Sequence, residues 1–95
     1  MKESKDLSNI KIFPNPVRPE FDGDIAITGL ADNTLVKITD INGRLVYQTY
    51  SNGGIATWNC RTFDGTRPAT GVYLAFCIVE DGSEKGMGKI LFIKY

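Results

Sequence analysis

Turn-forming clusters recur at intervals of about ten residues along this chain, and they constrain its fold more than any other feature. Each cluster combines Asn, Asp, Gly or Pro, the residues that allow positive φ or accept hydrogen bonds from their own backbone in tight turns. The clusters are Asn15-Pro16, Asp22-Gly23, Ala31-Asp32-Asn33, Asn42-Gly43, Asn52-Gly53-Gly54, Asp64-Gly65 and Asp81-Gly82. Short apolar runs fill the intervals, and none has apolar residues at i, i+3, i+4 and i+7. The spacing therefore predicts an all-β domain without helices.

The apolar runs predict a strand in each interval, seven in all. These strands cover residues 10–13, 24–28, 35–40, 44–50, 55–59, 71–80 and 87–94. The run 71–80 is apolar on both faces, which predicts the most central strand, and Trp58 is the expected centre of the core. Asn42-Gly43 predicts a hairpin with a type I′ turn, because such a turn needs positive φ at both central residues. Short antiparallel strands joined by short turns predict an immunoglobulin-like β-sandwich.

Length and charge limit the classes of partner. We expect residues 10–95 to form one domain and residues 1–9 to be a linker or lead segment. Eleven basic residues balance eleven acidic ones, so the chain lacks the basic face that nucleic-acid binding requires. No run approaches the ~18 apolar residues of a membrane span, and the polar start does not resemble a signal peptide. The chain is therefore expected to be cytoplasmic, or a piece of a longer exported protein.

Residue types needed for catalysis are missing. The chain contains no histidine, which excludes Ser-His-Asp and Cys-His arrangements and imidazole metal sites. Its Asp residues lie mostly in turns, where the side chain usually binds its own backbone. Asp22-Gly23-Asp24 lacks the spacing of a calcium loop, and no glycine cluster opens a helix as a phosphate cradle requires. We expect no enzymatic activity, no catalytic residue, no metal and no cofactor.

The cysteines and aromatic residues are open to more than one interpretation. Cys60 and Cys77 are expected to be either two free, buried thiols or a disulfide between their strands, and the sequence does not decide. The aromatic residues in predicted strands are expected to pack in the core rather than stack on sugars or bases. They are Tyr47, Tyr50, Trp58, Tyr73 and Phe76. Lys85, Lys89 and Lys94 near the last predicted strand are expected to protect a sheet edge from aggregation.

Several motifs in order resemble one family. Phe13-Pro14-Asn15-Pro16-Val17 resembles the start of the C-terminal domains of proteins exported by the type IX secretion system of Bacteroidetes-type bacteria. Residues 36–47, VKITDINGRLVY, resemble the central hairpin of that family, and Asp64-Gly65 followed by Gly71-Val72-Tyr73 resembles its next segment. Residues 89–94, KILFIK, resemble its closing strand with basic flanks. The resemblance covers residues 10–94 and implies the same sandwich fold.

A second resemblance runs through the middle of the chain. Trp58-Asn59, Asp64-Gly65 and residues 71–73 are similar to the immunoglobulin-like domain of flagellar hook-capping proteins. That family has Trp-Asp-Gly where this chain has Trp58-Asn59-Cys60. Both resemblances imply the same fold, but they imply different functions.

The first resemblance implies a C-terminal sorting domain carried by a larger protein through the periplasm to the cell surface. Its implied partners are the outer-membrane translocon and a sortase-like peptidase, which removes the domain and joins the cargo to anionic lipopolysaccharide. Cleavage is expected around residues 4–9, and an exposed last strand could add to the edge of a partner's sheet. The candidate recognition residues are Pro14, Asn15, Pro16, Gly43, Gly71, Val72, Tyr73, Lys89 and Lys94.

Two alternatives predict different behaviour. As a retained immunoglobulin-like module, the domain stays on a surface or periplasmic protein, as in a sensor or attachment-complex component, and binds a protein or lipopolysaccharide. As a hook-cap-like subunit, it self-assembles in a flagellated organism. The Pro14-Asn15-Pro16 and Gly71-Val72-Tyr73 motifs also have a purely architectural interpretation, since turn residues usually serve the fold.

Overall fold

The computed structural model describes residues 10–19, 21, 23–80, 82 and 84–93. Its seven strands are β1 (Lys11–Phe13), β2 (Ile25–Thr28), β3 (Leu35–Thr39), β4 (Leu45–Tyr50), β5 (Ala56–Trp58), β6 (Gly71–Ile78) and β7 (Lys85–Phe92). All seven predicted strands are present, although β7 begins earlier than the predicted residue 87. Within the described ranges no helix is long and apolar enough to cross a membrane.

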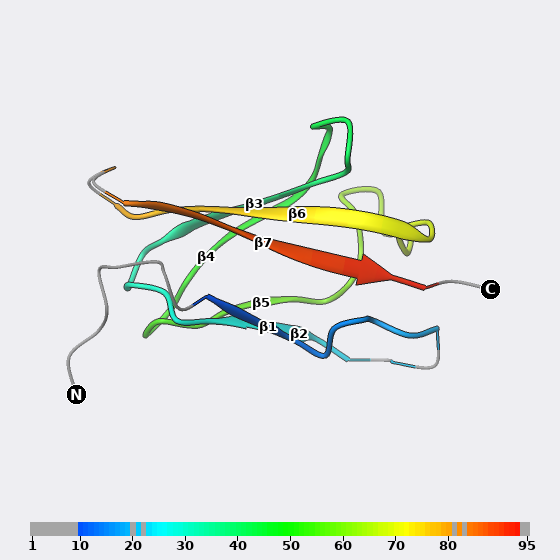
Figure 1. Ribbon diagram of the computed structural model, residues 1–95, viewed down its shortest axis with the longest axis horizontal. Helices are drawn as coiled ribbons and strands as arrows, with labels where there is room; N and C mark the ends of the chain where they lie inside the picture. The colour runs from blue at the N-terminus through cyan, green and yellow to red at the C-terminus, as the bar shows by residue number, and fades with distance from the viewer. Residues whose placement is uncertain (1–9, 20, 22, 81, 83, 94–95) are drawn as a thin grey trace.

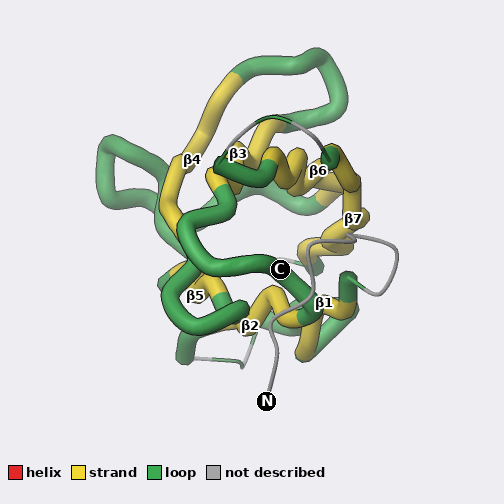
Figure 2. Tube along the Cα trace, turned by 90° about the vertical axis from the view of Figure 1, so that its left-hand side faces the viewer, coloured by secondary structure: helices red, strands yellow, loops and turns green. Residues whose placement is uncertain are grey.

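The strands form two antiparallel sheets that face each other. One sheet has the order β1-β2-β5 and the other has the order β4-β3-β6-β7. Figure 1 views the side on which β1 and β7 lie in front, with the larger sheet above the smaller one. Figure 2 looks along the strands and shows the two layers, with β1 below β7 and β5 below β4. The predicted immunoglobulin-like sandwich is therefore confirmed.

The core lies between the sheets and is centred on Trp58, as the sequence predicts. Trp58 and Phe92 are fully buried, and their rings meet edge to face with centroids 5.2 Å apart. Tyr47 stacks on Trp58 at 5.9 Å, and Tyr73 meets Phe92 edge to face at 5.5 Å. Such ring pairs contribute beyond the burial of their area, so aromatic residues from four strands join the two sheets.

The outer face of the larger sheet is apolar, which corrects one prediction. Tyr50 is 60% exposed and Phe76 is 37% exposed, so neither packs in the core. β6, predicted to be the most central strand, is one of the two inner strands of the larger sheet, between β3 and β7. Its second apolar face nevertheless points to solvent, because an antiparallel sheet in a two-layer sandwich has only one face on the core. An apolar run on both faces therefore indicates here an exposed apolar surface.

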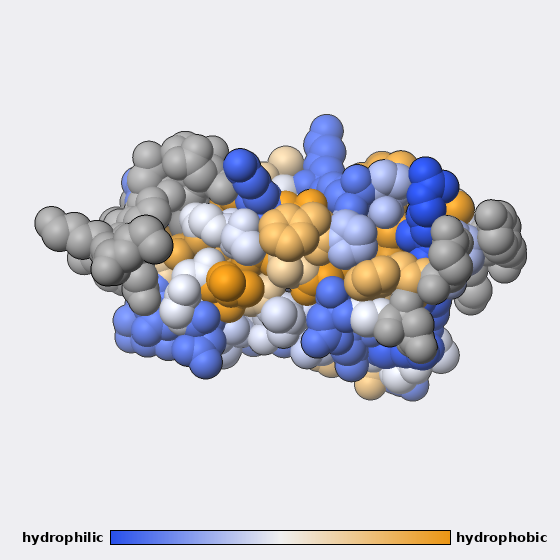
Figure 3. Space-filling model, turned by 90° about the horizontal axis from the view of Figure 1, so that it is seen from below, coloured by the Kyte–Doolittle hydropathy of each residue, from blue (hydrophilic) through white to orange (hydrophobic). Residues whose placement is uncertain are grey.

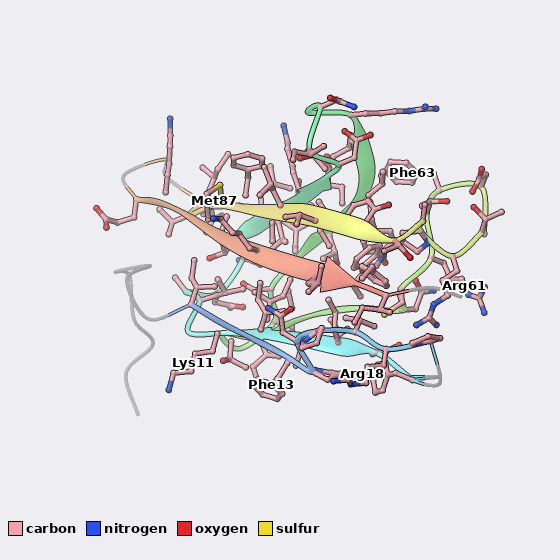
Figure 4. All side chains as sticks on the ribbon, turned by 45° about the vertical axis from the view of Figure 1, so that its right-hand side comes forward. Lys11, Phe13, Arg18, Arg61, Phe63 and Met87 are labelled. Carbon is pink, nitrogen blue, oxygen red and sulfur yellow. The ribbon has the colours of Figure 1, made fainter. Side chains whose placement is uncertain are left out.

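The outer face of the smaller sheet is also partly apolar. Phe13 on β1 is 53% exposed, and Ile55 beside β5 is 47% exposed. Figure 3, which views this face, shows apolar residues along its middle and hydrophilic residues toward its borders. Figure 4 shows Phe13 and Lys11 pointing away from the larger sheet. Exposed apolar side chains are common on protein surfaces.

The two cysteines are free and buried, which is the first of the two alternatives left open by the sequence. Burial raises the pKa of the Cys77 thiol to about 11 and also raises the pKa of Cys60. Thiols with raised pKa values are largely protonated at neutral pH and therefore poor nucleophiles. Both cysteines act here as small core residues.

Candidate recognition surface

The side chain of Asn15 lies across the outer edge of β7. Its Nδ2 donates a hydrogen bond to the carbonyl oxygen of Lys89 at 2.8 Å, and its Oδ1 accepts one from the amide of Leu91 at 3.1 Å. A carboxamide offers a donor and an acceptor side by side, as a peptide group does. The Asn15 side chain therefore pairs with these two backbone groups as a neighbouring strand would.

Val17 extends the contact with the edge of β7 through backbone hydrogen bonds. Its amide donates to the carbonyl of Leu91 at 2.7 Å, and its carbonyl accepts from the amide of Ile93 at 2.8 Å, which gives a parallel bridge to Phe92. β1 belongs to the smaller sheet, so the chain changes sheets between Phe13 and Val17. We call Asn15 and Val17 together with residues 89–93 the closed edge.

The two prolines lie at this change of sheet. The Phe13-Pro14 and Asn15-Pro16 peptide bonds are both cis. β1 ends at Phe13, directly before the first proline, which has no amide to donate to a neighbouring strand. Residues 14–16 form bends. The chain must cross from one sheet to the other within these few residues, and a straight segment would continue along the first sheet instead.

A close approach of β1 to β7 supports the closed edge from inside. Val17 is completely buried, and Ile10 and Ile12 pack against the core. A Cβ added at Gly88 would lie 2.5 Å from Ile12 Cδ1, which is well inside van der Waals contact. Gly88 therefore leaves the space that the β1 side chains fill.

The Gly71-Val72-Tyr73 motif pairs directly with the closed edge. Gly71 lies opposite Phe92, Val72 opposite Leu91, and Tyr73 opposite Ile90. Gly71 has φ 155°, a backbone conformation that residues with a Cβ rarely adopt. Tyr73 is buried and donates a hydrogen bond to the carbonyl of Ala69 at 3.0 Å. Within the motif only Val72, 37% exposed, offers a side chain to a partner.

Gly43 lies in the β3–β4 hairpin, and here the predicted turn type is wrong. Gly43 has φ 86°, whereas Asn42 is not among the residues with positive φ. The amide of Gly43 donates to the carbonyl of Asp40, and the amide of Asp40 donates to the carbonyl of Arg44. This is a three-residue loop, a turn followed by a left-handed glycine. Asp40 Oδ1 accepts from the amides of Asn42 and Arg44, each at 2.9 Å, and so selects this loop.

A hollow of about 340 Å³ lies between this hairpin and residues 62–69. Asp64 lines it and accepts hydrogen bonds from the hydroxyls of Thr62 and Thr66 and from the amide of Thr66. These bonds lower the pKa of Asp64 to about 2. The carboxylate is therefore committed to its own loop, as expected for Asp in a turn.

Arg67, which also lines the hollow, is held by the fold. Its Nη1 donates to the carbonyl of Phe21 at 3.0 Å and its Nη2 to the carbonyl of Arg18 at 2.9 Å. The guanidinium lies 5.8 Å from the centroid of the Phe92 ring, within range of a cation–π interaction. Among the described residues no group of three Cys, Asp or Glu side chains could hold a metal ion. The Asp64 and Arg67 side chains of the hollow are both held by contacts within the domain.

Comparison with protein families identifies the chain. Residues 11–94 match the model of the secretion system C-terminal sorting domain. The chain belongs to this family. The match covers the closed edge, the hairpin and the Gly71-Val72-Tyr73 motif together, and it indicates a role of the sorting domain in secretion.

Two solved structures are similar to the sorting domain. PorZ of Porphyromonas gingivalis, described as an essential bacterial surface component of the type IX secretion system, is 36% identical with a TM-score of 0.85. Dimeric latent PorU of the same organism is 26% identical with a TM-score of 0.60. The similarity covers 97% and 90% of this chain but only 12% and 9% of those chains. A comparison with curated proteins gives no match.

The structure brings together most of the predicted site residues of the sorting domain. Asn15, Lys89 and Val72 lie at or beside the closed edge. Gly43 lies in the β3–β4 hairpin, and β4 is the opposite edge strand of the same sheet. Lys94 and the expected cleavage region lie outside the described residues. Sequence reasoning missed Val17 and Leu91, and an apolar residue directly after the second proline was the available signal for Val17.

Proposed function

We propose that this domain is a secretion signal carried by a larger protein and recognised in its folded form by the type IX translocon. Family membership over residues 11–94 supports a sorting role. The observation that carries the proposal is the closed edge, where the Pro14-Asn15-Pro16 motif meets the last strand. Motif residues far apart in the sequence thus form one surface, which exists only in the folded domain.

The proposal extends to the later steps at the cell surface. A sortase-like peptidase cleaves within residues 4–9, and the cargo is joined to anionic lipopolysaccharide. All seven described strands lie after this region, so cleavage there would leave each of them whole. The domain acts in this scheme as a substrate and docking module.

A second candidate function is a retained docking module on a surface protein. The similarity to PorZ, described as a surface component of the secretion system, favours this alternative. Here the same folded domain stays attached and binds a protein partner or lipopolysaccharide. The two functions differ in whether the mature protein keeps the domain.

The test is a secretion assay in a bacterium that has a type IX system. The chain is fused behind a reporter with its own inner-membrane export signal, and surface-exposed reporter is measured by protease accessibility. We expect surface delivery in the wild-type host and retention in a host that lacks the translocon. Equal delivery in both hosts would contradict the proposal.

Two further measurements sharpen the assay. Asn15→Leu, which removes the hydrogen bonds across β7, should lower delivery, whereas Gln48→Leu on the exposed outer edge of β4 should not. The intact mass of the surface reporter then separates the two candidate functions. Loss of the domain with an added glycolipid mass indicates a cleaved signal, and an unchanged mass indicates a retained module.

A further inference from the structure

The outer edge of β7 is closed along only half of its length. The β6–β7 register runs without a shift from Gly71 opposite Phe92 to Ile78 opposite Lys85. Leu91 directs both its amide and its carbonyl away from β6, toward Asn15 and Val17. The direction of the backbone groups alternates along an antiparallel strand. The amides and carbonyls that point away from β6 therefore also include those of Lys85, Met87 and Lys89.

Among the strands that the structure describes, none pairs with the other half of this edge. Of these outward groups, the carbonyl of Lys89 is bonded by Asn15. Among the described residues, no hydrogen bond reaches the outward groups of Lys85 and Met87 or the amide of Lys89. We call these five backbone groups the open edge. An edge of this kind can accept the strand of another chain.

Side chains on the open edge form an alternating pattern. Lys85, Met87 and Lys89 are all exposed on the outer face, and Met87 is 50% exposed. Figure 4 shows Met87 on the side of β7 away from the smaller sheet. Gly86 and Gly88 alternate with them and place no side chain of β7 on its inner side, where Ile12 of β1 approaches Gly88. An added strand would therefore meet a basic, an apolar and a basic side chain in turn.

The charges of this pattern indicate which kind of strand can bind to the open edge. A second copy paired antiparallel about Met87 would place Lys85 opposite Lys89 at two positions, and like charges directly opposite are destabilising. The strands of the larger sheet contribute Lys37, Lys85 and Lys89 to this face, and β3, β6 and β7 contain no acidic residue. The complementary strand is therefore acidic where β7 is basic.

We propose that the open edge binds an extended segment of a partner protein as an added strand, with acidic side chains opposite Lys85 and Lys89 and an apolar side chain opposite Met87. The segment has the pattern acidic-x-apolar-x-acidic and spans about 13 Å at ~3.3 Å per residue. It makes up to five hydrogen bonds with the backbone of β7. This inference deepens the proposed function and rests on it, since the partner would be a component that recognises the sorting domain.

The first test is an NMR titration of the ¹⁵N-labelled chain with the end-blocked peptide Thr-Glu-Thr-Val-Thr-Glu-Thr. We expect shift changes at residues 85–89 and at 74–78 of the paired strand β6, and slower amide exchange at Met87 and Lys89. A peptide with Lys in place of both Glu residues should bind about tenfold more weakly. A peptide with N-methylvaline at its centre should lose binding, because it cannot donate to Met87. Absence of shift changes at 85–89 at millimolar peptide would overturn the inference.

Variants of β7 then test the charge pattern and the backbone separately. The double variant Lys85→Glu, Lys89→Glu should reverse the preference, so that the lysine peptide binds more tightly. Met87→Pro should abolish binding of the glutamate peptide, because proline removes the central donor of the open edge. Gln48→Pro is the matched control on the opposite edge strand β4 and should leave binding unchanged. An unreversed preference in the double variant, or equal losses for Met87→Pro and Gln48→Pro, would overturn the inference.

The same variants distinguish the inference from the proposed function. Reversal of peptide preference together with loss of surface delivery by the double variant supports both. Surface delivery by the wild-type domain without peptide binding at the open edge overturns the inference and leaves the proposed function intact. Peptide binding without delivery of the wild-type fusion overturns the proposed function, while the open edge remains a docking site.

Discussion

The two sides of the sandwich are closed in different ways. On the β1–β7 side, Asn15 and Val17, which follow β1, form hydrogen bonds with the edge of β7, and Ile12 of β1 approaches Gly88. On the β4–β5 side, Tyr47 lies between Trp58 and Phe63, with ring centroids 5.9 and 6.2 Å apart. One side depends on directed polar contacts and a close approach, and the other depends on buried aromatic area.

This difference indicates how substitutions on each side should change the free energy of unfolding. Hydrogen bonds at a partly exposed edge are replaced by bonds to water when they break, so each contributes only about 1 kcal/mol to the free energy of unfolding. A buried ring loses its transfer free energy and leaves a cavity when it is truncated. We therefore expect the aromatic side to dominate stability and the hydrogen-bonded side to control the local geometry of the edge.

The largest expected effect is that of Trp58→Ala on the aromatic side. This change removes a fully buried ring and its hydrogen bond from Nε1 to the carbonyl of Arg61. It should lower the free energy of unfolding by about 3–5 kcal/mol in urea denaturation. Phe63→Ala is the control, because Phe63 is 65% exposed, and it should cost ~1 kcal/mol or less. Equal costs would contradict the assignment of Trp58 as the centre of this side.

Gly88→Val tests the close approach on the other side. A valine side chain would overlap Ile12 Cδ1, which lies 2.5 Å from an added Cβ, and should cost about 1–3 kcal/mol through overpacking. Ile12→Ala frees that space. The double variant should therefore lose less stability than the sum of the two single variants. Additive losses in thermal or urea unfolding would show that β1 does not press on Gly88.

Asn15→Leu should have a smaller effect, about 1 kcal/mol, with a local signature. The amide of Leu91 should lose protection in hydrogen exchange, whereas the amide of Ile93, bonded to Val17, should keep it. Asn15→Asp is the matched variant, because its carboxylate still accepts from Leu91 but cannot donate to Lys89. Restored protection of Leu91 in Asn15→Asp would support the described geometry. Equal loss of protection at Ile93 in Asn15→Leu would contradict it.

The smallest expected effect on stability comes from the titration of Asp64, in the loop next to the aromatic side. Asp64 should titrate near 2, below the ordinary value of 3.8, in carboxyl NMR measurements. A lowered pKa in the folded state means that the stabilisation is complete above the ordinary value and is lost as the pH falls toward 2. Thr66→Val should raise the pKa of Asp64 toward its ordinary value, since Thr66 donates to this carboxylate through its hydroxyl. An unchanged titration would contradict the threonine contribution.

The sequence predicts the strands and the central position of Trp58 because these features depend on local patterns. Alternation and turn residues act within a few positions, so spacing alone locates the strands. The turn at Asn42-Gly43 was misassigned because the side chain of Asp40, two residues earlier, organises a longer loop. The exposure of Phe76 was missed because an apolar residue does not reveal which sheet face is covered.

The closed edge could not be predicted, because it joins Asn15 to Lys89 and Leu91, 74 and 76 positions apart. The motif resemblance placed Asn15 and Lys89 among the candidate residues, but it did not indicate that they touch. Their contact depends on the register of the whole larger sheet, which sequence spacing does not determine. The lysines of the last strand did predict an exposed sheet edge, but which half of β7 is open depends on the same register.

The bridge between Val17 and Phe92 also makes the domain sensitive to the completeness of its chain. Residues 14–17 are made early, but their hydrogen-bonding partners at 89–93 are made about seventy residues later. A chain that stops before Ile93 cannot form both bonds of Val17, and one that stops before Lys89 leaves Asn15 without either of its partners. A receptor that requires the closed edge would therefore not bind truncated chains. Recognition would then depend on complete synthesis of the chain through β7.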